Sequence, residues 1–106
     1  MGIKDYLATK VDFGNEVNQI RITKIAKAGT LESNDILIMV MPNDSGKVEL
    51  ELESIVMQQF GDVIKQVILH KVQEMGVEGI TIKAQDKGAL NCTIGARVET
   101  AITRAL

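Results

Sequence analysis

Few side chains in this sequence have types and spacings that could perform catalysis. The 106 residues include one histidine, His70, and one cysteine, Cys92. A hydrolytic nucleophile needs a neighbouring base, and a zinc site needs several histidine or thiolate ligands. One histidine and one cysteine provide neither, and a lone cysteine allows no intramolecular disulfide. We therefore interpret His70 as a residue at the edge of an apolar helical face and Cys92 as a buried, unreactive thiol.

Three carboxylates, Glu49, Glu51 and Glu53, alternate with apolar residues and could imitate an acid–base pair. Alternate residues of a strand lie about 7 Å apart on one face, here an open surface. We therefore interpret them as a solvated face and expect no catalytic residue and no metal site in this chain. The glycine-containing segments 76–79 and 86–88 lack the spacing of phosphate-binding loops, so we interpret them as turns.

Ser33 is the remaining candidate, because it stands in a polar loop after Gly29, beside Glu32, Asn34 and Asp35. No histidine is near it in the sequence, which argues against hydrolase chemistry at this serine. An exposed serine in such a loop is instead a good substrate for a modifying enzyme that brings its own base and metal. The alternative interpretation is an ordinary turn serine.

The elements that would position this loop begin with three strands. Residues 22–28 form a short β-branched segment, and residues 36–41 are too short for a helix and end at Pro42. We predict that 36–41 is a strand buried on both faces. Residues 48–53 alternate, which places Val48, Leu50 and Leu52 on one face. With a turn at 42–46, the second and third strands are predicted to form a β-hairpin.

A helical period follows, in which apolar side chains recur at about 100° per residue from Ser54 to Gly76. We predict Ser54 as the N-cap and Gly76 as a left-handed glycine that ends the helix. The predicted apolar face consists of Val56, Met57, Phe60, Ile64, Val67, Ile68 and Met75.

A further strand and a second helix complete the pattern. Residues 79–84 alternate and turn Ile80, Ile82 and Ala84 inward. Asp86 is placed to cap a final helix whose apolar residues recur at spacings of three and four. Its predicted apolar face consists of Leu90, Ile94, Val98, Ala101, Ile102 and Ala105.

The predicted order is strand, strand, strand, helix, strand, helix, which is typical of a small two-layer α+β domain. The strands lie mostly in the N-terminal half, and both helices are expected to cover one face of the sheet. Residues 1–21 show no sustained period, so we assign them no element. We divide the chain into an N-terminal extension, 1–21, and a domain, 22–106. Three interpretations of the extension stay open: a natural, disordered extension, a docking arm or an artificial leader.

Composition narrows the function classes. The chain has 12 Lys and Arg against 14 Asp and Glu, a net charge of −2, and 3% aromatic residues. Without a basic surface or stacking platforms, we expect no nucleic-acid partner. The longest apolar run, residues 36–41, is far below the ~20 residues that cross a bilayer, and no signal-peptide or myristoylation pattern is present. We therefore expect a cytoplasmic protein without a membrane partner, and the lone cysteine suits a reducing compartment.

The segment Ala28-Gly29-Thr30-Leu31-Glu32-Ser33-Asn34-Asp35 resembles the modification motif of the citrate lyase acyl carrier proteins, the gamma subunits of a bacterial complex. Residues 54–61 and 86–92 resemble the two helix starts of that family, and 96–99 resembles the helix that follows. The resemblance runs in order from about residue 22 to residue 106 and leaves out the first 21 residues.

The resemblance implies a carrier and not an enzyme. Ser33 would hold a 2'-(5''-phosphoribosyl)-3'-dephospho-CoA group through a phosphodiester, and the thiol of that group would carry acetyl and citryl thioesters. The implied partners are the alpha subunit, an acyl transferase that releases acetate, and the beta subunit, a citryl lyase that releases oxaloacetate. A prosthetic-group transferase and a citrate lyase ligase would act on the carrier. Two alternatives remain: the carrier subunit of malonate decarboxylase, and a small interaction module without a prosthetic group.

Overall fold

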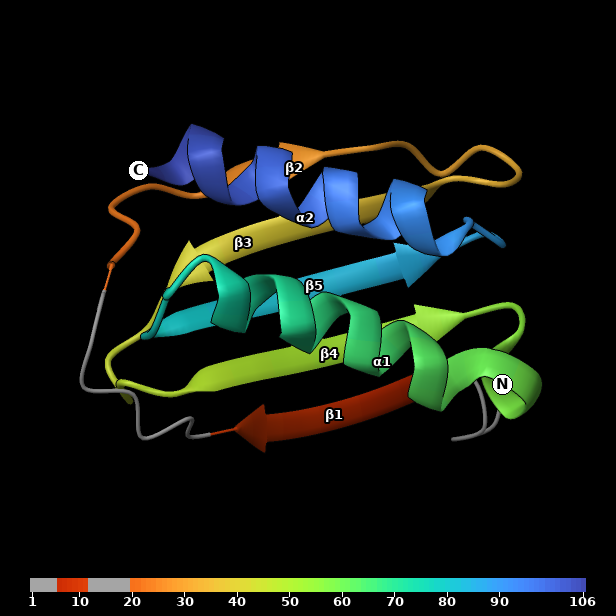
Figure 1. The fold of residues 1–106 in the computed structure, drawn as a ribbon, viewed down its shortest axis with the longest axis horizontal. Coiled ribbons are helices and arrows are strands. Elements are labelled where there is room, and N and C mark those ends of the chain that lie inside the picture. The colour runs from red at the N-terminus through yellow and green to blue at the C-terminus, as the bar shows by residue number, and fades with distance from the viewer. Residues whose placement is uncertain (1–5, 12–19) are drawn as a thin grey trace.

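Two helices pack against one face of a five-stranded sheet and make two layers (Figure 1). The structure is a computed structural model and describes residues 6–11 and 20–106. The predicted α+β class is confirmed, with strands mostly in the N-terminal half and both helices on one face. In chain order the elements are β1 (Tyr6–Val11), β2 (Ala26–Ala28), β3 (Ile36–Pro42), β4 (Val48–Ser54), α1 (Met57–Glu74), β5 (Ile80–Asp86) and α2 (Asn91–Ala105).

The strand order across the sheet is β1-β4-β5-β3-β2. Strand β5 lies between β3 and β4, antiparallel to β3 and parallel to β4, so the predicted hairpin of 36–41 with 48–53 is wrong. Parallel neighbours need a long crossover, which α1 supplies between β4 and β5. Two strands that flank a third are about 10 Å apart, and the residues between β3 and β4, at about 3.3 Å each, span that distance.

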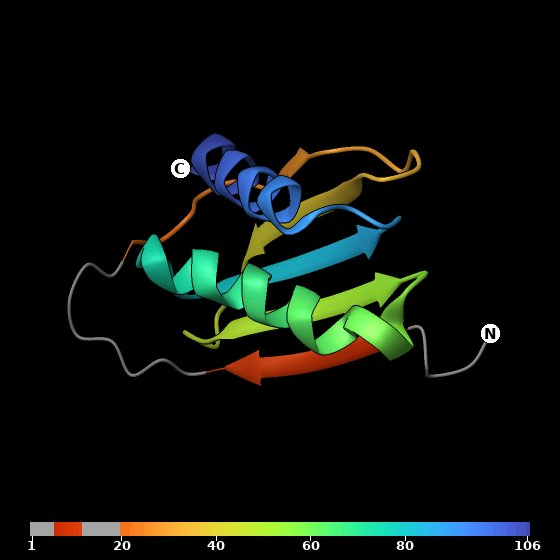
Figure 2. The same ribbon diagram turned by 45° about the vertical axis from the view of Figure 1, so that its right-hand side comes forward.

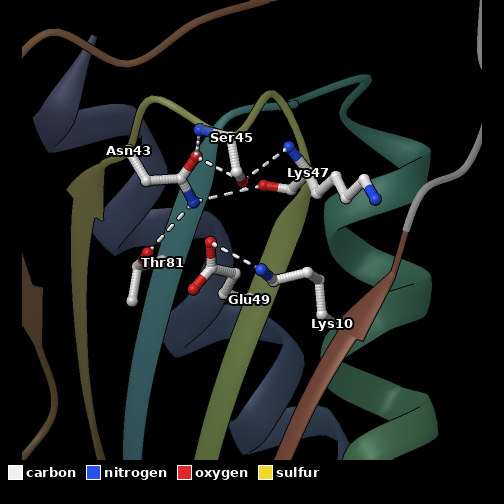
Figure 3. A network of polar contacts seen from close by, with 6 residues as sticks. All are labelled: Lys10, Asn43, Ser45, Lys47, Glu49 and Thr81. Carbon is white, nitrogen blue, oxygen red and sulfur yellow. Dashed lines mark hydrogen bonds and ion pairs between the residues drawn. The ribbon is translucent and has the colours of Figure 1, made fainter.

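A polar network supports this wide turn beside the start of β5 (Figure 3). Asn43 Nδ2 donates to Thr81 Oγ1 on β5 at 3.0 Å and to the Lys47 carbonyl at 3.2 Å. The Asn43 side-chain oxygen accepts from the backbone N–H and the hydroxyl of Ser45 at 3.0 and 2.9 Å, and the Ser45 hydroxyl accepts from the Lys47 N–H at 3.1 Å. One asparagine therefore connects the turn to the strand that it crosses.

Strand β3 is buried on one face only. Ile36, Ile38 and Val40 are fully buried, whereas Leu37 and Met39 are half-buried on the opposite face. The prediction of burial on both faces is therefore wrong, because both helices lie on the same side of the sheet. The apolar run of β3 matches the sequence of a doubly covered strand, although it lies in a two-layer fold.

One core is formed by the inner face of the sheet and the facing sides of α1 and α2. The two predicted inward rows, Val48, Leu50 and Leu52 on β4 and Ile80, Ile82 and Ala84 on β5, are confirmed. The largest fully buried side chains are Ile36, Ile38, Leu50, Leu52, Ile68, Ile80, Ile82, Ile94, Ile102, Val40, Val48 and Val72.

The helix limits differ from the prediction at the N-terminal end of α1. Ser54 ends strand β4 and does not cap the helix: its hydroxyl donates to Asp86 Oδ2 at 2.7 Å and accepts from the Val56 N–H at 3.1 Å. Gly76 has a φ of 70°, so the predicted left-handed glycine after α1 is confirmed. Neither helix in the described part of the chain combines the length and the apolar character that crossing a membrane requires.

Strand β1 lies within residues 1–21, to which the sequence analysis assigned no element. It pairs antiparallel with β4, and Lys10 Nζ lies 3.8 Å from Glu49 Oε2 across the pair (Figure 3). Its side chains are only exposed or half-buried, so this edge strand has no strong apolar period in its sequence. The other residues of that segment, 1–5 and 12–19, lie outside the described residues. The predicted strand at 22–28 is limited to β2.

Candidate functional site

Ser33 lies at the apex of a tight turn between β2 and β3. The Asp35 N–H donates to the Glu32 carbonyl at 3.2 Å, so Ser33 and Asn34 are the two central residues of the turn. Asn34 has a φ of 67°, the conformation that a type II turn requires at its third position and that asparagine tolerates better than most residues. Ser33 is exposed at the second position. The turn therefore presents the serine hydroxyl to solvent.

Gly29 allows the loop to leave β2 close to the start of β3. Its φ is 96°, and a Cβ at this position would lie 1.8 Å from the carbonyl oxygen of Ile36. Any side chain would collide with backbone and would also strain a left-handed conformation. The glycine in the motif thus has a local structural reason.

The base of the turn is held by an ion pair with α2. Arg97 donates to Asp35 through Nε and Nη2, each at 3.0 Å, and Thr30 Oγ1 donates to the same carboxylate at 2.7 Å. Asp35 also accepts from the N–H of Ile36 at 2.7 Å. These bonds, with the one from Arg97 as the largest cause, lower the pKa of Asp35 to about 2. Asp35 is therefore charged at neutral pH and fixes the loop to the helix.

A second connection joins the turn to the segment between β5 and α2. The Asn34 N–H donates to the Lys87 carbonyl at 2.8 Å, and the Lys87 N–H donates to the Asp35 carbonyl at 2.9 Å. That segment is itself fixed, because the buried Asp86 accepts from the Ala89 N–H at 3.0 Å. The Ser33 turn thus has a rigid base and an exposed apex.

The other candidate residues lie apart from this turn. His70 is exposed on α1, and Glu49, Glu51 and Glu53 are half-buried on the sheet face opposite the helices. Cys92 is exposed, so the prediction of a buried thiol is wrong. It occupies the second position of α2, before Ile94, the first buried residue of the helix.

Within residues 6–11 and 20–106, no three His, Cys, Asp or Glu side chains gather as a metal site. In the same described part of the chain, the side-chain hydrogen bonds of the loop run through Thr30 and Asp35 and do not include the Ser33 hydroxyl. This geometry suits a hydroxyl that another protein modifies. The sequence predicted Ser33 as the candidate site but did not show that Asp35 and Arg97 hold its turn, since these two residues are 62 positions apart.

Comparison with known proteins identified acyl carrier proteins as relatives of this chain. The acyl carrier family model described as "Malonate decarboxylase delta subunit (MdcD)" matches residues 23–105. A citrate lyase acyl carrier protein of Vibrio cholerae serotype O1 (strain M66-2) is 48% identical over 86 residues, which cover 81% of this chain and 88% of that protein. A protein of the same name from Streptococcus equi subsp. equi (strain 4047) is 49% identical over 86 residues, 81% of this chain and 84% of that protein.

A solved structure shares the fold. A chain of a Pseudomonas malonate decarboxylase hetero-tetramer in complex with malonate aligns with a TM-score of 0.77 and covers 95% of this chain and 98% of that chain. The sequence identity is 15%, so the likeness concerns the fold alone.

Proposed function

This chain belongs to the citrate lyase acyl carrier protein family, and on that premise we propose that it carries acetyl and citryl groups on an arm attached to Ser33, for the cleavage of citrate to acetate and oxaloacetate. The chain is a carrier subunit and not itself a catalyst. The observation that carries the proposal is the turn at residues 32–35, which exposes one serine hydroxyl on a base held by two other segments.

The arm is proposed to be 2'-(5''-phosphoribosyl)-3'-dephospho-CoA, joined to Ser33 as a phosphodiester. When bound, it supplies a thiol that holds acyl groups as thioesters, so the chain provides only attachment, orientation and docking surfaces. At the base of the turn the carboxylate of Asp35 is neutralised by Arg97, and the backbone of Lys87 is hydrogen-bonded to the turn. The exposed hydroxyl leaves room for a modifying enzyme to bring its own base.

The proposed partners follow from the same premise. An alpha subunit would exchange acetyl for citryl, and a beta subunit would cleave the citryl thioester. A prosthetic-group transferase would modify Ser33, and a citrate lyase ligase would acetylate the thiol. We propose that residues 22–106 suffice for these contacts, because the family model begins at residue 23. A cytoplasmic location is proposed, since a thiol arm needs a reducing compartment.

A second candidate is the carrier subunit of malonate decarboxylase. The description of the matching family model favours it. The relatives that are 46–49% identical favour citrate lyase, because that identity extends over 86 residues. Reconstitution separates the two: the modified chain should restore citrate cleavage to carrier-free citrate lyase subunits and should not restore malonate decarboxylation to carrier-free decarboxylase subunits.

Intact-mass measurement tests the attachment itself. The protein is produced in cells that contain the prosthetic-group transferase and its precursor, and the wild type is expected to gain the mass of the arm. S33A should gain none. S45A is the matched control, because Ser45 is another exposed turn serine among only three serines in the chain. A wild type without added mass, or S33A with it, would contradict the proposal and favour an interaction module without a prosthetic group.

A further inference from the structure

An apolar cavity of about 560 Å³ lies between the starts of α1 and α2. Its volume is in the range of about 300–1,000 Å³ that is typical of small-molecule sites. Val56, Phe60 and Val63 line it from the side of α1, and Leu90 and Cys92 line it from the side of α2. Figures 1 and 2 both show the two helix starts at the end of the molecule where the loop between β2 and β3 also lies.

The apolar residues around the cavity include Phe60 and Leu90, which the sequence predicted to lie on the core-facing sides of the two helices. Phe60 is 54% exposed and Leu90 is 70% exposed, and Val63 is also exposed. Exposed apolar side chains that gather around one hollow mark a binding site more often than single exposed residues do. This site is separate from the ion pair and the turn described above.

The cavity begins beside the serine turn. The backbone N–H of Asn34, the residue after Ser33, donates to the Lys87 carbonyl. Gly88, which follows Lys87, lines the cavity. A Cβ at Gly88 would lie 3.8 Å from the side-chain oxygen of Asn34 and 3.9 Å from Cδ1 of Ile55. A flexible group attached to Ser33 therefore starts next to the rim of the hollow, one residue from Asn34.

The chemistry of the lining selects an uncharged occupant. Among residues 6–11 and 20–106, no Asp, Glu, Lys or Arg belongs to the cavity wall, which is formed by aliphatic, aromatic and small residues with one asparagine and one cysteine. Placing a phosphate or a carboxylate there would cost its hydration without supplying a counter-charge. An amide-linked chain that ends in a thiol or an acetyl thioester carries no charge and fits this wall.

We propose that the cavity between α1 and α2 receives the uncharged end of the arm on Ser33 when that end is a free thiol or an acetyl thioester. The inference rests on the proposed function. Attachment at the rim raises the local concentration of the arm end to about the millimolar range, so a weak apolar site is filled. A citryl thioester, with its carboxylates, is excluded from the cavity and remains in solvent, where a partner subunit reaches it.

Cys92 serves as the reporter in the test. The modified chain, isolated from all other subunits, is treated with diamide, which takes up the two protons and two electrons released when the arm thiol and the Cys92 thiol form a disulfide. The product loses two hydrogen atoms and links the Ser33 peptide to the Cys92 peptide. The matched control combines C92S with Q85C. Gln85 is exposed near the C-terminal end of β5, on the sheet face opposite the helices.

We expect the bond to Cys92 to form at least about tenfold faster than the bond to Q85C, after each rate is divided by that cysteine's rate with free oxidised glutathione. F60Q should reduce the rate at Cys92 toward the control value. I25Q, which changes another exposed apolar residue far from the cavity, should leave it unchanged.

Equal normalised rates on a chain whose mass shows the arm would overturn the cavity proposal and leave the carrier function intact. If F60Q leaves that rate unchanged but weakens binding to the other subunits, the cavity receives a protein and the proposal is also wrong. A chain that acquires no arm contradicts both proposals. The amide NMR shift of Leu90 in the acetyl-loaded chain should differ from that in S33A, which carries no arm, and citryl loading should move the shift to the S33A value. Equal shifts in the acetyl and citryl states would overturn the exclusion of the citryl group.

Discussion

Replacing Asp35 with Asn removes the charge that ties the Ser33 turn to helix α2. The substituted side chain keeps one oxygen, which can replace either the Oδ2 that accepts from Thr30 or the Oδ1 that accepts from the N–H of Ile36, and Arg97 loses its bidentate carboxylate. We expect D35N to lower the free energy of unfolding at neutral pH and to slow the proposed modification of Ser33, because the base of its turn is less firmly held.

The magnitude follows from the pKa of Asp35, which falls from 3.8 to about 2 in the folded protein. A difference of nearly two units corresponds to about 2.5 kcal/mol, and solvent screening at the Arg97 side chain, which is 40% exposed, reduces the expected loss to about 1 kcal/mol. Because the folded-state pKa is the lower one, this stabilisation is present above the unfolded pKa of about 4. It is lost as the pH falls through about 2.

Urea unfolding at neutral pH and near pH 2 measures the effect. Wild type and D35N should differ by about 1 kcal/mol at neutral pH, and the difference should close near pH 2. E32Q removes a carboxylate from the same turn without breaking that ion pair and should show no such pH-dependent difference. A D35N deficit of the same size at both pH values would refute the assignment of the stabilisation to the charged pair.

G29A should lower the free energy of unfolding by more than about 1–2 kcal/mol, because a Cβ at this position would collide with backbone. G46A has a similar positive φ but open space around it, so it should lower the free energy of unfolding by less. Thermal unfolding of both variants tests this prediction. S54A removes the hydroxyl that donates to Asp86, and both residues are 2% exposed, so urea unfolding should show a loss of about 1–3 kcal/mol; a neutral result would contradict the importance of this bond. Deleting residues 1–21 should lower the melting temperature by removing β1 but leave the mass gain at Ser33 intact, and loss of that gain would contradict the proposed 22–106 carrier domain.

Local patterns predicted the faces of the strands correctly where burial alternates. The rows that include Leu50 on β4 and Ile82 on β5 are buried as expected, because a period of two in the sequence records which side of a strand is covered. Gly76 was equally predictable, since a glycine after an amphipathic helix commonly adopts the left-handed conformation that ends it.

Strand partners could not be predicted in the same way. An alternating pattern shows that a face is buried but does not identify the neighbouring strand, so residues 36–41 and 48–53 were paired through the turn between them. In the fold, β5 is inserted there after an 18-residue helix, and it takes hydrogen bonds from both sides. Strand β1 was missed because its edge position requires little apolar surface.

At the candidate site, too, local features could be predicted and tertiary contacts could not. Eight consecutive residues around Ser33 were sufficient to predict a modification motif, because a motif is a matter of local residue identity. The firm base of the turn depends on Arg97 and on the Lys87 backbone, which are distant in sequence and meet it only when α2 packs on the sheet. Cys92 and the apolar cavity beside the Ser33 turn are exposed because the starts of α1 and α2 lie apart on the sheet. The periodicity of a helix shows which of its sides is apolar but does not give the distance between two helices.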